Sequence, residues 1–263
     1  MSLDNMFHGG IKMCVYGRSG TGKTTFWGSF PGRILALMCS GSDPSGELRS
    51  INTPEHRKKI DAVLIKSPSD MVDAVAYLKD NHGLYSTVVV DHITELQRLI
   101  LSGILNVPDL PEILTWGTAT RDQWGQCSSQ TVELLKIILG LETNVVLVAQ
   151  EREFDPTQDS TGILVPYVAA AMTPAATGWL NPAVDYIVQT CIRKQKIARK
   201  TKIAGKETTV FEETGVMEYG LRVGPHDVYV TKFRLPMVGK SLPDVIVNPT
   251  YQKVKALIDG QGS

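Results

Sequence analysis

The sequence has no excess of charge of either sign, because 27 lysines and arginines balance 27 aspartates and glutamates in 263 residues. A neutral chain has no overall field that attracts nucleic acid or another polyanion, so such binding has to come from a local patch. Cysteine is also scarce. The four cysteines lie far apart and form no C-x-x-C pair, which argues against a disulfide framework or a cysteine-based metal site. We therefore expect a reducing, cytoplasmic setting.

Long apolar runs are absent as well. No run approaches the roughly 18 residues that a membrane-spanning helix needs, and no basic segment followed by an apolar one opens the chain. We expect neither an export signal nor a membrane partner. Since 43% of the residues are hydrophobic, the chain can bury a large core without disulfides or metals. Its length fits one domain over residues 1–263.

Short apolar runs alternate with helical segments over the first part of the chain. These runs are typical of buried strands, which we expect at residues 11–16, 34–38, 62–65, 87–91 and 144–150. The capping box Ser67-Pro68-Ser69-Asp70 begins one of the helices between them. Other helices are expected at about residues 22–30, 93–105 and 120–139. The alternation predicts an α/β fold with a mainly parallel central sheet flanked by helices.

The second part of the sequence lacks this order. Residues 151–182 show no clean period, and a stretch of about 30 residues exceeds the usual loop length, which indicates a functional or mobile loop. Beyond it, residues 186–192, 215–223 and 228–234 are expected to form antiparallel strands, and residues 249–258 a closing helix. We expect a core at about residues 11–192 and a C-terminal strand extension at about residues 193–263.

The strongest motif is Gly17-Arg18-Ser19-Gly20-Thr21-Gly22-Lys23-Thr24, which has the P-loop pattern G-x-x-x-x-G-K-[ST]. Its glycines let backbone N–H groups close around phosphates, while Lys23 reaches the β- and γ-phosphates and the Thr24 hydroxyl ligates Mg²⁺. A predicted strand precedes the motif, and a predicted helix that includes Thr25 follows it. An incidental glycine-rich turn does not account for this context. The sequence therefore predicts an ATP site formed by Gly17 to Thr25.

Two other strands end in polar residues that suit the same chemistry. Asp91 can hold the water shell of Mg²⁺ beside the phosphates, although an aspartate at this place is also an ordinary helix N-cap. Gln150 can hydrogen-bond the γ-phosphate or the attacking water, or it can be a polar residue whose partners are backbone groups. We expect Lys23, Asp91 and Gln150 to act in catalysis, and Thr24 and Asp91 to hold the metal.

In this order of motifs the sequence resembles the RecA-like ATPases, particularly the compact phage-encoded kind that is linked to single-strand annealing and recombination. Besides the P-loop, the resemblance rests on residues 87–94 and 228–236, and it covers about residues 11–258. It implies a RecA-like core and ATP hydrolysis with Mg²⁺. It also implies a role in DNA recombination, with single-stranded DNA as a partner and a homo-oligomer that is a ring or a filament.

The resemblance further implies a role for Lys232 and Arg234. The two alternate along a predicted strand, so both point to the same face. In the resembling family, such cations reach across a subunit interface to the γ-phosphate of the neighbour, where they stabilise charge and couple ATP to assembly. The alternative is a pair of surface cations on an edge strand.

One position departs from the family pattern. RecA-like ATPases usually place a glutamate just after the second strand to activate the attacking water, whereas residues 37–43 read Leu-Met-Cys-Ser-Gly-Ser-Asp. Asp43 or Glu47 would have to substitute for it. Without such a base, hydrolysis is expected to be slow, and nucleotide binding itself would act as the switch.

Two features are candidates for DNA contact. RecA-like proteins hold a single strand with loops that here correspond to about residues 106–118 and 152–181, and the second contains Arg152 among small polar residues suited to phosphate contacts. The other feature is a cationic run without an acid, made of Arg193, Lys194, Lys196, Arg199, Lys200, Lys202 and Lys206. It can follow a phosphate backbone or form the solvated rim of a hairpin.

Two other functions are compatible with a P-loop. A small-molecule kinase would use residues 193–206 as a lid over an acceptor pocket and would act as a monomer. The long helix after the Asp91 strand and the inserted strand ending in Gln150 argue against it. A nucleotide-dependent assembly switch without rapid hydrolysis is supported by the missing glutamate. The leading hypothesis is a DNA-dependent ATPase.

Overall fold

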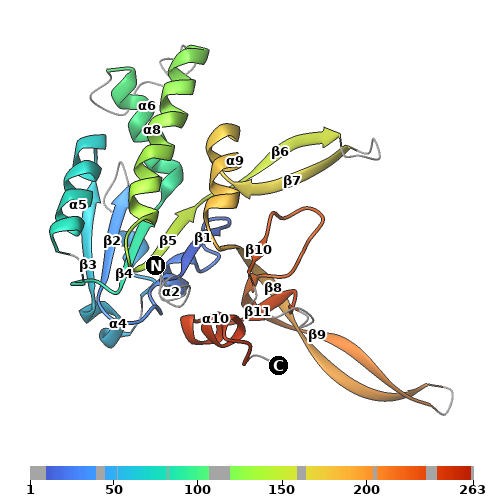
Figure 1. The fold of residues 1–263 in the computed structure, drawn as a ribbon. Coiled ribbons are helices and arrows are strands. Elements are labelled where there is room, and N and C mark those ends of the chain that lie inside the picture. Colours follow the sequence, from blue (N-terminus) through green and yellow to red (C-terminus); the bar gives the residue numbers. More distant parts are fainter. Residues whose placement is uncertain are drawn as a thin grey trace.

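A mixed sheet forms the centre of the molecule (Figure 1). Within the described residues it has nine strands in the order β11-β9-β8-β1-β5-β4-β2-β3, with β10 paired to β8. The computed structural model describes residues 10–39, 45–51, 53–81, 83–106, 119–158, 164–203, 206–234 and 242–261.

Neighbouring strands in the middle of this sheet run parallel, as expected from the alternation of apolar and helical segments. They are β1 (Lys12–Tyr16), β2 (Ile34–Cys39), β3 (Ile60–Ile65), β4 (Thr87–Asp91), β5 (Asn144–Ala149) and β8 (Tyr186–Ile203). In the register, Tyr16 lies opposite Ala149, and Asp91 lies opposite Val148 on one side and Met38 on the other. The carboxyl ends of four strands therefore meet at one edge, which is where ligands bind in open α/β sheets.

Helices cover both faces of the sheet. One face carries α5 (Pro68–Asp80), α6 (Ile93–Ile104), α8 (Arg121–Leu139) and α9 (Pro174–Ala183), and the other carries α2 (Lys23–Trp27) and α10 (Tyr251–Ile258). Two short helices, α3 (Ser45–Leu48) and α4 (Pro54–Lys58), lie in the connection between β2 and β3. Among the described residues, no helix is both long and apolar enough to cross a membrane.

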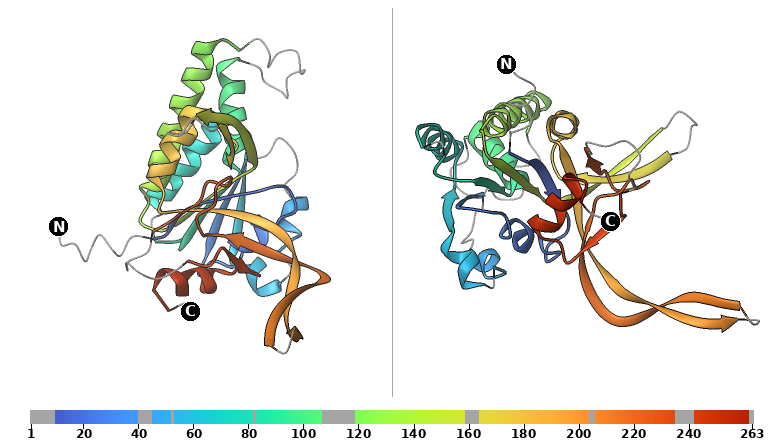
Figure 2. Two further views of the ribbon diagram at one scale, coloured as in Figure 1. Left: turned by 90° about the vertical axis from the view of Figure 1, so that its right-hand side faces the viewer. Right: turned by 60° about the horizontal axis from the view of Figure 1, so that its bottom comes forward.

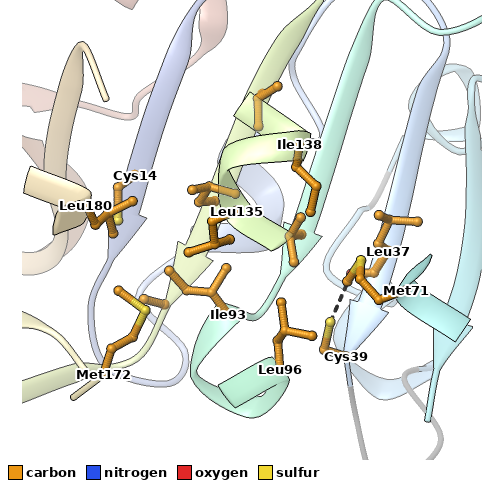
Figure 3. Close-up of a cluster of buried hydrophobic side chains, with 14 of the residues drawn as sticks. Cys14, Leu37, Cys39, Met71, Ile93, Leu96, Leu135, Ile138, Met172 and Leu180 are labelled. Carbon is orange, nitrogen blue, oxygen red and sulfur yellow. Dashed lines mark hydrogen bonds between the residues drawn. The ribbon is translucent and has the colours of Figure 1, made fainter. Parts of the chain in front are cut away.

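Alternate residues of the central strands belong to two separate core clusters, because successive side chains point to opposite faces of a sheet. Cys14 and Leu37 are fully buried on the side of the long helices, where they belong to one cluster with Ile93 of α6, Leu135 of α8 and Leu180 of α9 (Figure 3). The intervening strand residues pack against α2 and α10. Burial on both faces explains why the sequences of the central strands are continuous apolar runs.

Local signals set the starts of the helices. The predicted capping box of α5 is present, since the Ser67 hydroxyl accepts from the backbone N–H of Asp70 and the Asp70 carboxylate accepts from that of Ser67. Helix α8 begins with a second capping box, formed by Thr120 and Gln123. The helix expected at residues 120–139 is confirmed.

The prediction of a loop at residues 151–182 is wrong. These residues form a hairpin of β6 (Glu151–Gln158) and β7 (Leu164–Ala170), followed by α9. The pattern is hidden because the ladder has an irregularity between Phe154 and Thr157, and because a two-stranded hairpin on the surface buries few side chains. Without a buried face, no strict alternation of apolar residues is required.

The strands beyond residue 186 are longer than expected. β8 extends to Ile203 and pairs along most of its length with the antiparallel β9 (Lys206–Arg222), and the outer part of this hairpin extends away from the rest of the molecule (Figure 2). β8 is also parallel to β1, so only one of its two main neighbours is antiparallel. Of residues 228–234, only β10 (Lys232–Phe233) forms a strand, and β11 (Val245–Val247) was not expected. One sheet thus joins the core to the C-terminal strands.

Candidate nucleotide-binding site

The P-loop connects the end of β1 to the start of α2 and needs its glycines. Gly20 and Gly22 have φ angles of 78° and 90°, a left-handed conformation that costs other residues energy. Gly17 is required for a different reason, since a Cβ atom there would lie 2.3 Å from Oγ1 of Thr190 on β8. The loop therefore lies directly against β8, and the predicted strand–loop–helix context is confirmed.

Lys23 folds back over this loop. Its Nζ donates to the carbonyl oxygens of Gly17 (2.8 Å) and Arg18 (2.7 Å), and the residue is 8% exposed. Thr21 stabilises the same turn, because its hydroxyl donates to the Arg18 carbonyl and lies 2.6 Å from the Thr190 hydroxyl. These contacts place the ammonium group at the mouth of the loop.

Asp91 lies at the same edge of the sheet, at the end of β4. It is 4% exposed, and its Oδ2 accepts a 2.8 Å hydrogen bond from the indole nitrogen of Trp27 on α2. Trp27 thus orients the carboxylate from the helix that also carries Thr24. The hydroxyl of Thr24 and the carboxylate of Asp91 are hard oxygen donors of the kind that Mg²⁺ prefers.

The residue after Asp91 contributes to the site as well. Nδ1 of His92 accepts from the backbone N–H of Glu95 at 3.2 Å and so caps α6. Burial, followed by the charges of Lys23 and Arg98, lowers the pKa of His92 to about 4. The imidazole is therefore neutral at physiological pH and adds no positive charge beside Lys23.

Glu95 supplies a carboxylate that we did not expect from the sequence. Its side chain is 14% exposed and forms a 3.1 Å ion pair with Arg98. Burial, followed by the charges of Asp91 and Glu95, raises the pKa of Cys39, the last residue of β2. The Glu95 carboxylate thus lies near the ends of β2 and β4, the region where the missing glutamate was expected. The signal for Glu95 in the sequence is its spacing of four residues from Asp91. This spacing places Glu95 in the first turn of α6, next to the end of β4.

Gln150 and Glu151 follow β5 at this edge. The backbone N–H of Gln150 donates to the Thr94 hydroxyl at 3.2 Å. Glu151 accepts from Nε of Arg18 at 2.7 Å and from Nε2 of Gln189 at 3.2 Å. A polar connection therefore runs from the P-loop to the first residue of the β6–β7 hairpin, and its members Glu151 and Gln189 were missed because nothing in the sequence marks their proximity.

Lys232 and Arg234 contact their own chain. Nζ of Lys232 donates to the carbonyl oxygens of Asn181, Pro182 and Val184 at the C-terminal end of α9. Arg234 forms a 2.7 Å ion pair with Asp185. These contacts lie toward the amino ends of β1 and β8, since the backbone N–H of Asp185 donates to the Lys12 carbonyl. The two cations are thus directed away from the P-loop of their own chain, and their action on a neighbour stays a prediction.

The cationic run lies on β8 except for Lys206, which begins β9, and glutamates of β9 face the part on β8. Arg193, Lys194 and Arg199 form ion pairs with Glu218, Glu213 and Glu212, at 2.6, 3.1 and 3.1 Å respectively. Lys196 and Lys200 are exposed and form no ion pair within the part of the chain that the structure describes, although Lys196 lies opposite Glu213, the partner of Lys194. The hairpin therefore partly neutralises a run that looks purely basic in the sequence.

Arg152 lies on β6 beside an aromatic pair. Its guanidinium is 5.4 Å from the centre of the Phe154 ring, and Phe154 stacks on Tyr167 of β7 with ring centres 5.1 Å apart. Several expected residues lie outside the described part: Asp43, the side chains of Glu47, Lys202 and Lys206, and residues 107–118.

A P-loop at the end of a buried parallel strand, beside an aspartate that ends a neighbouring strand, defines the protein as a P-loop ATPase. ATP is the nucleotide and Mg²⁺ the usual metal of this class. The residues present fit both, because Gly20 leaves open space beside the loop and Thr24 and Asp91 provide oxygen donors.

The chain belongs to a family of AAA domains, which it matches over residues 9–235. No curated protein matches the sequence. Among solved structures, the chain is similar to a KaiC-like protein of the hyperthermophilic archaeon Pyrococcus horikoshii, with 12% identity and a TM-score of 0.40 over 92% of this chain and 90% of that one. It is also similar to the flagellar accessory protein FlaH of Methanocaldococcus jannaschii, with 10% identity and a TM-score of 0.41 over 94% and 90%.

Proposed function

We propose that this protein hydrolyses ATP as a homo-oligomer on single-stranded DNA, in recombination or strand annealing, and that it is phage-encoded. The observation that carries the hydrolytic part is the arrangement of Lys23 and Asp91 at one edge of the sheet, with Trp27 holding the aspartate. Lys23 would neutralise charge on the terminal phosphates, and Thr24 and Asp91 would hold the Mg²⁺ that supplies further positive charge there. The resemblance to annealing ATPases supports the DNA and phage parts.

Glu95 favours hydrolysis over a pure nucleotide switch. Its carboxylate lies near the end of β2 and forms an ion pair with Arg98, and its backbone is fixed by the His92 cap. A carboxylate in this place orients a water for attack on the terminal phosphate. The site therefore has a candidate base in Glu95, although no glutamate directly follows β2 in the sequence.

The two hairpins support the DNA part of the proposal. Arg152 on β6 offers a cation to phosphates, as do Lys196 and Lys200 on β8, and aromatic rings accompany Arg152. Single strands are bound by such combinations of backbone contacts and stacking. A kinase lid is less well supported, because residues 193–203 belong to a long strand paired with β9.

Apolar side chains on the β8–β9 hairpin support self-association. Phe211, Val216 and Met217 are 67%, 56% and 57% exposed on a ribbon that extends from the body of the protein (Figure 2). A two-stranded ribbon has little stability of its own in water, and clustered apolar surface marks interaction sites. A further subunit is the partner that fits the proposed oligomer.

The experiment that tests this function is an ATPase assay with and without single-stranded DNA, combined with light scattering. We expect Lys23→Ala to lose ATP binding and Asp91→Asn to keep binding but lose Mg²⁺-dependent turnover by about a hundredfold or more. Lys58→Ala, on the exposed surface of α4, is the matched control. Wild-type turnover by Lys23→Ala would contradict the site assignment, and a rate unchanged by DNA in an assembled protein would contradict the DNA part.

A further inference from the structure

Tyr219 of β9 lies against the P-loop although it is about 200 residues away in sequence. Its Cδ1 is 3.2 Å from the position that a Cβ atom on Gly22 would occupy, and the side chain is nevertheless 49% exposed. Part of the ring therefore contacts the loop glycine, and the rest is open to solvent beside the site. A large aromatic ring half exposed at the mouth of a phosphate-binding loop has no role in the core.

Hydrogen bonds and close packing fix the backbone that carries this ring. Tyr219 pairs with Ile192 in the β8–β9 ladder, and its carbonyl oxygen accepts from the backbone N–H of Asn248 at 2.8 Å. The next residue, Gly220, is tightly packed, since a Cβ atom there would lie 2.6 Å from Val245 of β11. The backbone that carries the ring thus belongs to the supported inner end of the hairpin, which places the ring beside the P-loop.

The order of strands gives the direction in which a nucleotide lies. Asp91 and Glu95 are on the β4 side of β1, so they mark the side of the terminal phosphate and the metal. β8 and β9 flank β1 on the opposite side, where Thr190 and Tyr219 contact the loop. Consider a triphosphate that lies along the loop with its terminal phosphate near Asp91. Its nucleoside is then at the other end of the loop, on the side of β9.

We propose that Tyr219 is the surface on which the base of the bound nucleoside triphosphate stacks. The proposal rests on the function proposed for the P-loop and adds the subsite for the base. Stacking on an aromatic face is available to every base, and purines offer the larger surface. We therefore expect Tyr219 to contribute equally to the affinities for ATP and GTP, because stacking on a ring face does not distinguish the hydrogen-bonding groups of the two bases.

Binding of the Mg²⁺ complexes of ATP and of inorganic tripolyphosphate, measured by calorimetry on the full chain, tests this subsite, because tripolyphosphate has the phosphates without the base. We expect Tyr219→Ala to weaken ATP binding about tenfold, as expected for the removal of one stacking surface, and to leave tripolyphosphate binding unchanged. Tyr219→Phe should keep wild-type affinity for ATP. Val72→Ala, which changes an exposed apolar residue of α5, is the control and should bind both ligands like the wild type.

Equal weakening of ATP and tripolyphosphate binding in Tyr219→Ala would overturn the proposal, since it would show that the ring only shapes the loop. Unchanged ATP binding in that variant would also overturn it. Failure of the P-loop assignment would look different, because ATP would then bind to Lys23→Ala as it does to the wild type. Denaturant unfolding of Tyr219→Phe and Tyr219→Ala establishes that both variants are folded.

Discussion

Asp91 is oriented by Trp27, and the P-loop is braced by Thr190, although neither partner belongs to the motif that identifies the site. Both are fully or almost fully buried. Buried hydrogen bonds of this kind fix a functional group at little cost in entropy, since their own side chains are locked by packing. At the scale of residues, the candidate phosphate site therefore depends on a second set of side chains contributed by α2 and β8.

The Glu95 carboxylate should decide the rate of hydrolysis. Glu95→Gln keeps the shape of the side chain and removes the base, so we expect ATP binding to persist while turnover falls about a hundredfold or more. The measurement is steady-state ATPase activity together with nucleotide binding. Glu151→Gln is the comparison, because this carboxylate also lies beside the P-loop but contacts Arg18 and Gln189.

Wild-type turnover in Glu95→Gln would rule out this role. Asp43→Asn and Glu47→Gln in the same assay test the segment after β2. A complete loss of turnover in one of these two variants, with Glu95→Gln active, would place the base in that segment.

Lys12 should make stability depend on pH at the opposite edge of the sheet. Its Nζ donates to the carbonyl oxygens of Leu141 and Thr143, and burial lowers its pKa from 10.5 to about 8. The unfolded chain therefore binds more protons between these values, so stability rises with pH through this window and the gain disappears as pH falls through about 8. Because the side chain is partly exposed, we expect less than about 1 kcal/mol between about pH 7 and pH 9.

Urea unfolding at the two pH values, compared between wild type and Lys12→Met, measures this contribution. The thiol of Cys14, whose pKa burial raises to about 12, opposes the trend above pH 9 in both proteins alike. The difference between the two slopes therefore reports Lys12. Identical slopes would contradict the shifted pKa.

At the scale of elements, the β8–β9 hairpin combines exposed apolar side chains with cations that are only partly paired. Pairing across the strands decides which cations remain available, because a glutamate opposite an arginine reduces the field that a phosphate would meet. The sequence run of seven cations is thus reduced to a smaller set in which Lys196 and Lys200 form no ion pair among the described residues.

Replacing Lys196 and Lys200 by serine should flatten the salt dependence of binding to single-stranded DNA. Removing one cation that binds a phosphate should reduce the slope of log K against log salt concentration by about 0.7. The matched control is the double variant Arg193→Ser and Lys194→Ser, whose cations already pair with Glu218 and Glu213, so its slope should change less. A slope equal to that of the wild type in the first variant would identify the segment as a solvated hairpin rim.

At the scale of the whole molecule, the C-terminal part completes the fold. β11 pairs with β9, and Val254 and Leu257 of α10 pack into the same cluster as Phe26 and Trp27 of α2. Residues from the end of the chain thus support the helix that carries Thr24. Lys232 and Arg234 are held at the end of α9, so a role at a neighbouring P-loop requires that they leave these contacts in the assembly.

Mixing two inactive variants tests whether the active site is shared between subunits. A Lys232→Ala chain has an intact P-loop and a Lys23→Ala chain has an intact Lys232, so a mixed interface can combine both. If Lys232 acts in trans, we expect ATPase activity to reappear in the mixture and to rise with protein concentration. The measurement is activity per chain across mixing ratios, with light scattering to show that mixed oligomers form.

Removal of the hydrogen bonds to α9 could also inactivate the Lys232→Ala chain by destabilising it, so urea unfolding of this variant accompanies the assay. A stable variant that forms mixed oligomers without any recovery of activity would contradict the shared site.

The sequence by itself determined the elements whose signals are local. The glycines and lysine of the P-loop, the apolar run that ends in Asp91 and the capping box at Ser67 each lie within a few residues. The P-loop between a strand and a helix, the parallel strands and most helices could therefore be predicted. The hairpin of β6 and β7 could not, because it buries too few side chains to impose an alternating pattern.

Only the tertiary structure decided which distant residues meet at the site. Trp27 reaches Asp91 across 64 positions, Thr190 reaches Thr21 across 169, and Tyr219 touches Gly22 because β9 follows β8 in the sheet. The same pairing placed glutamates opposite the basic run. Such contacts depend on strand order and register, which arise from packing over the whole chain and leave no local pattern in the sequence.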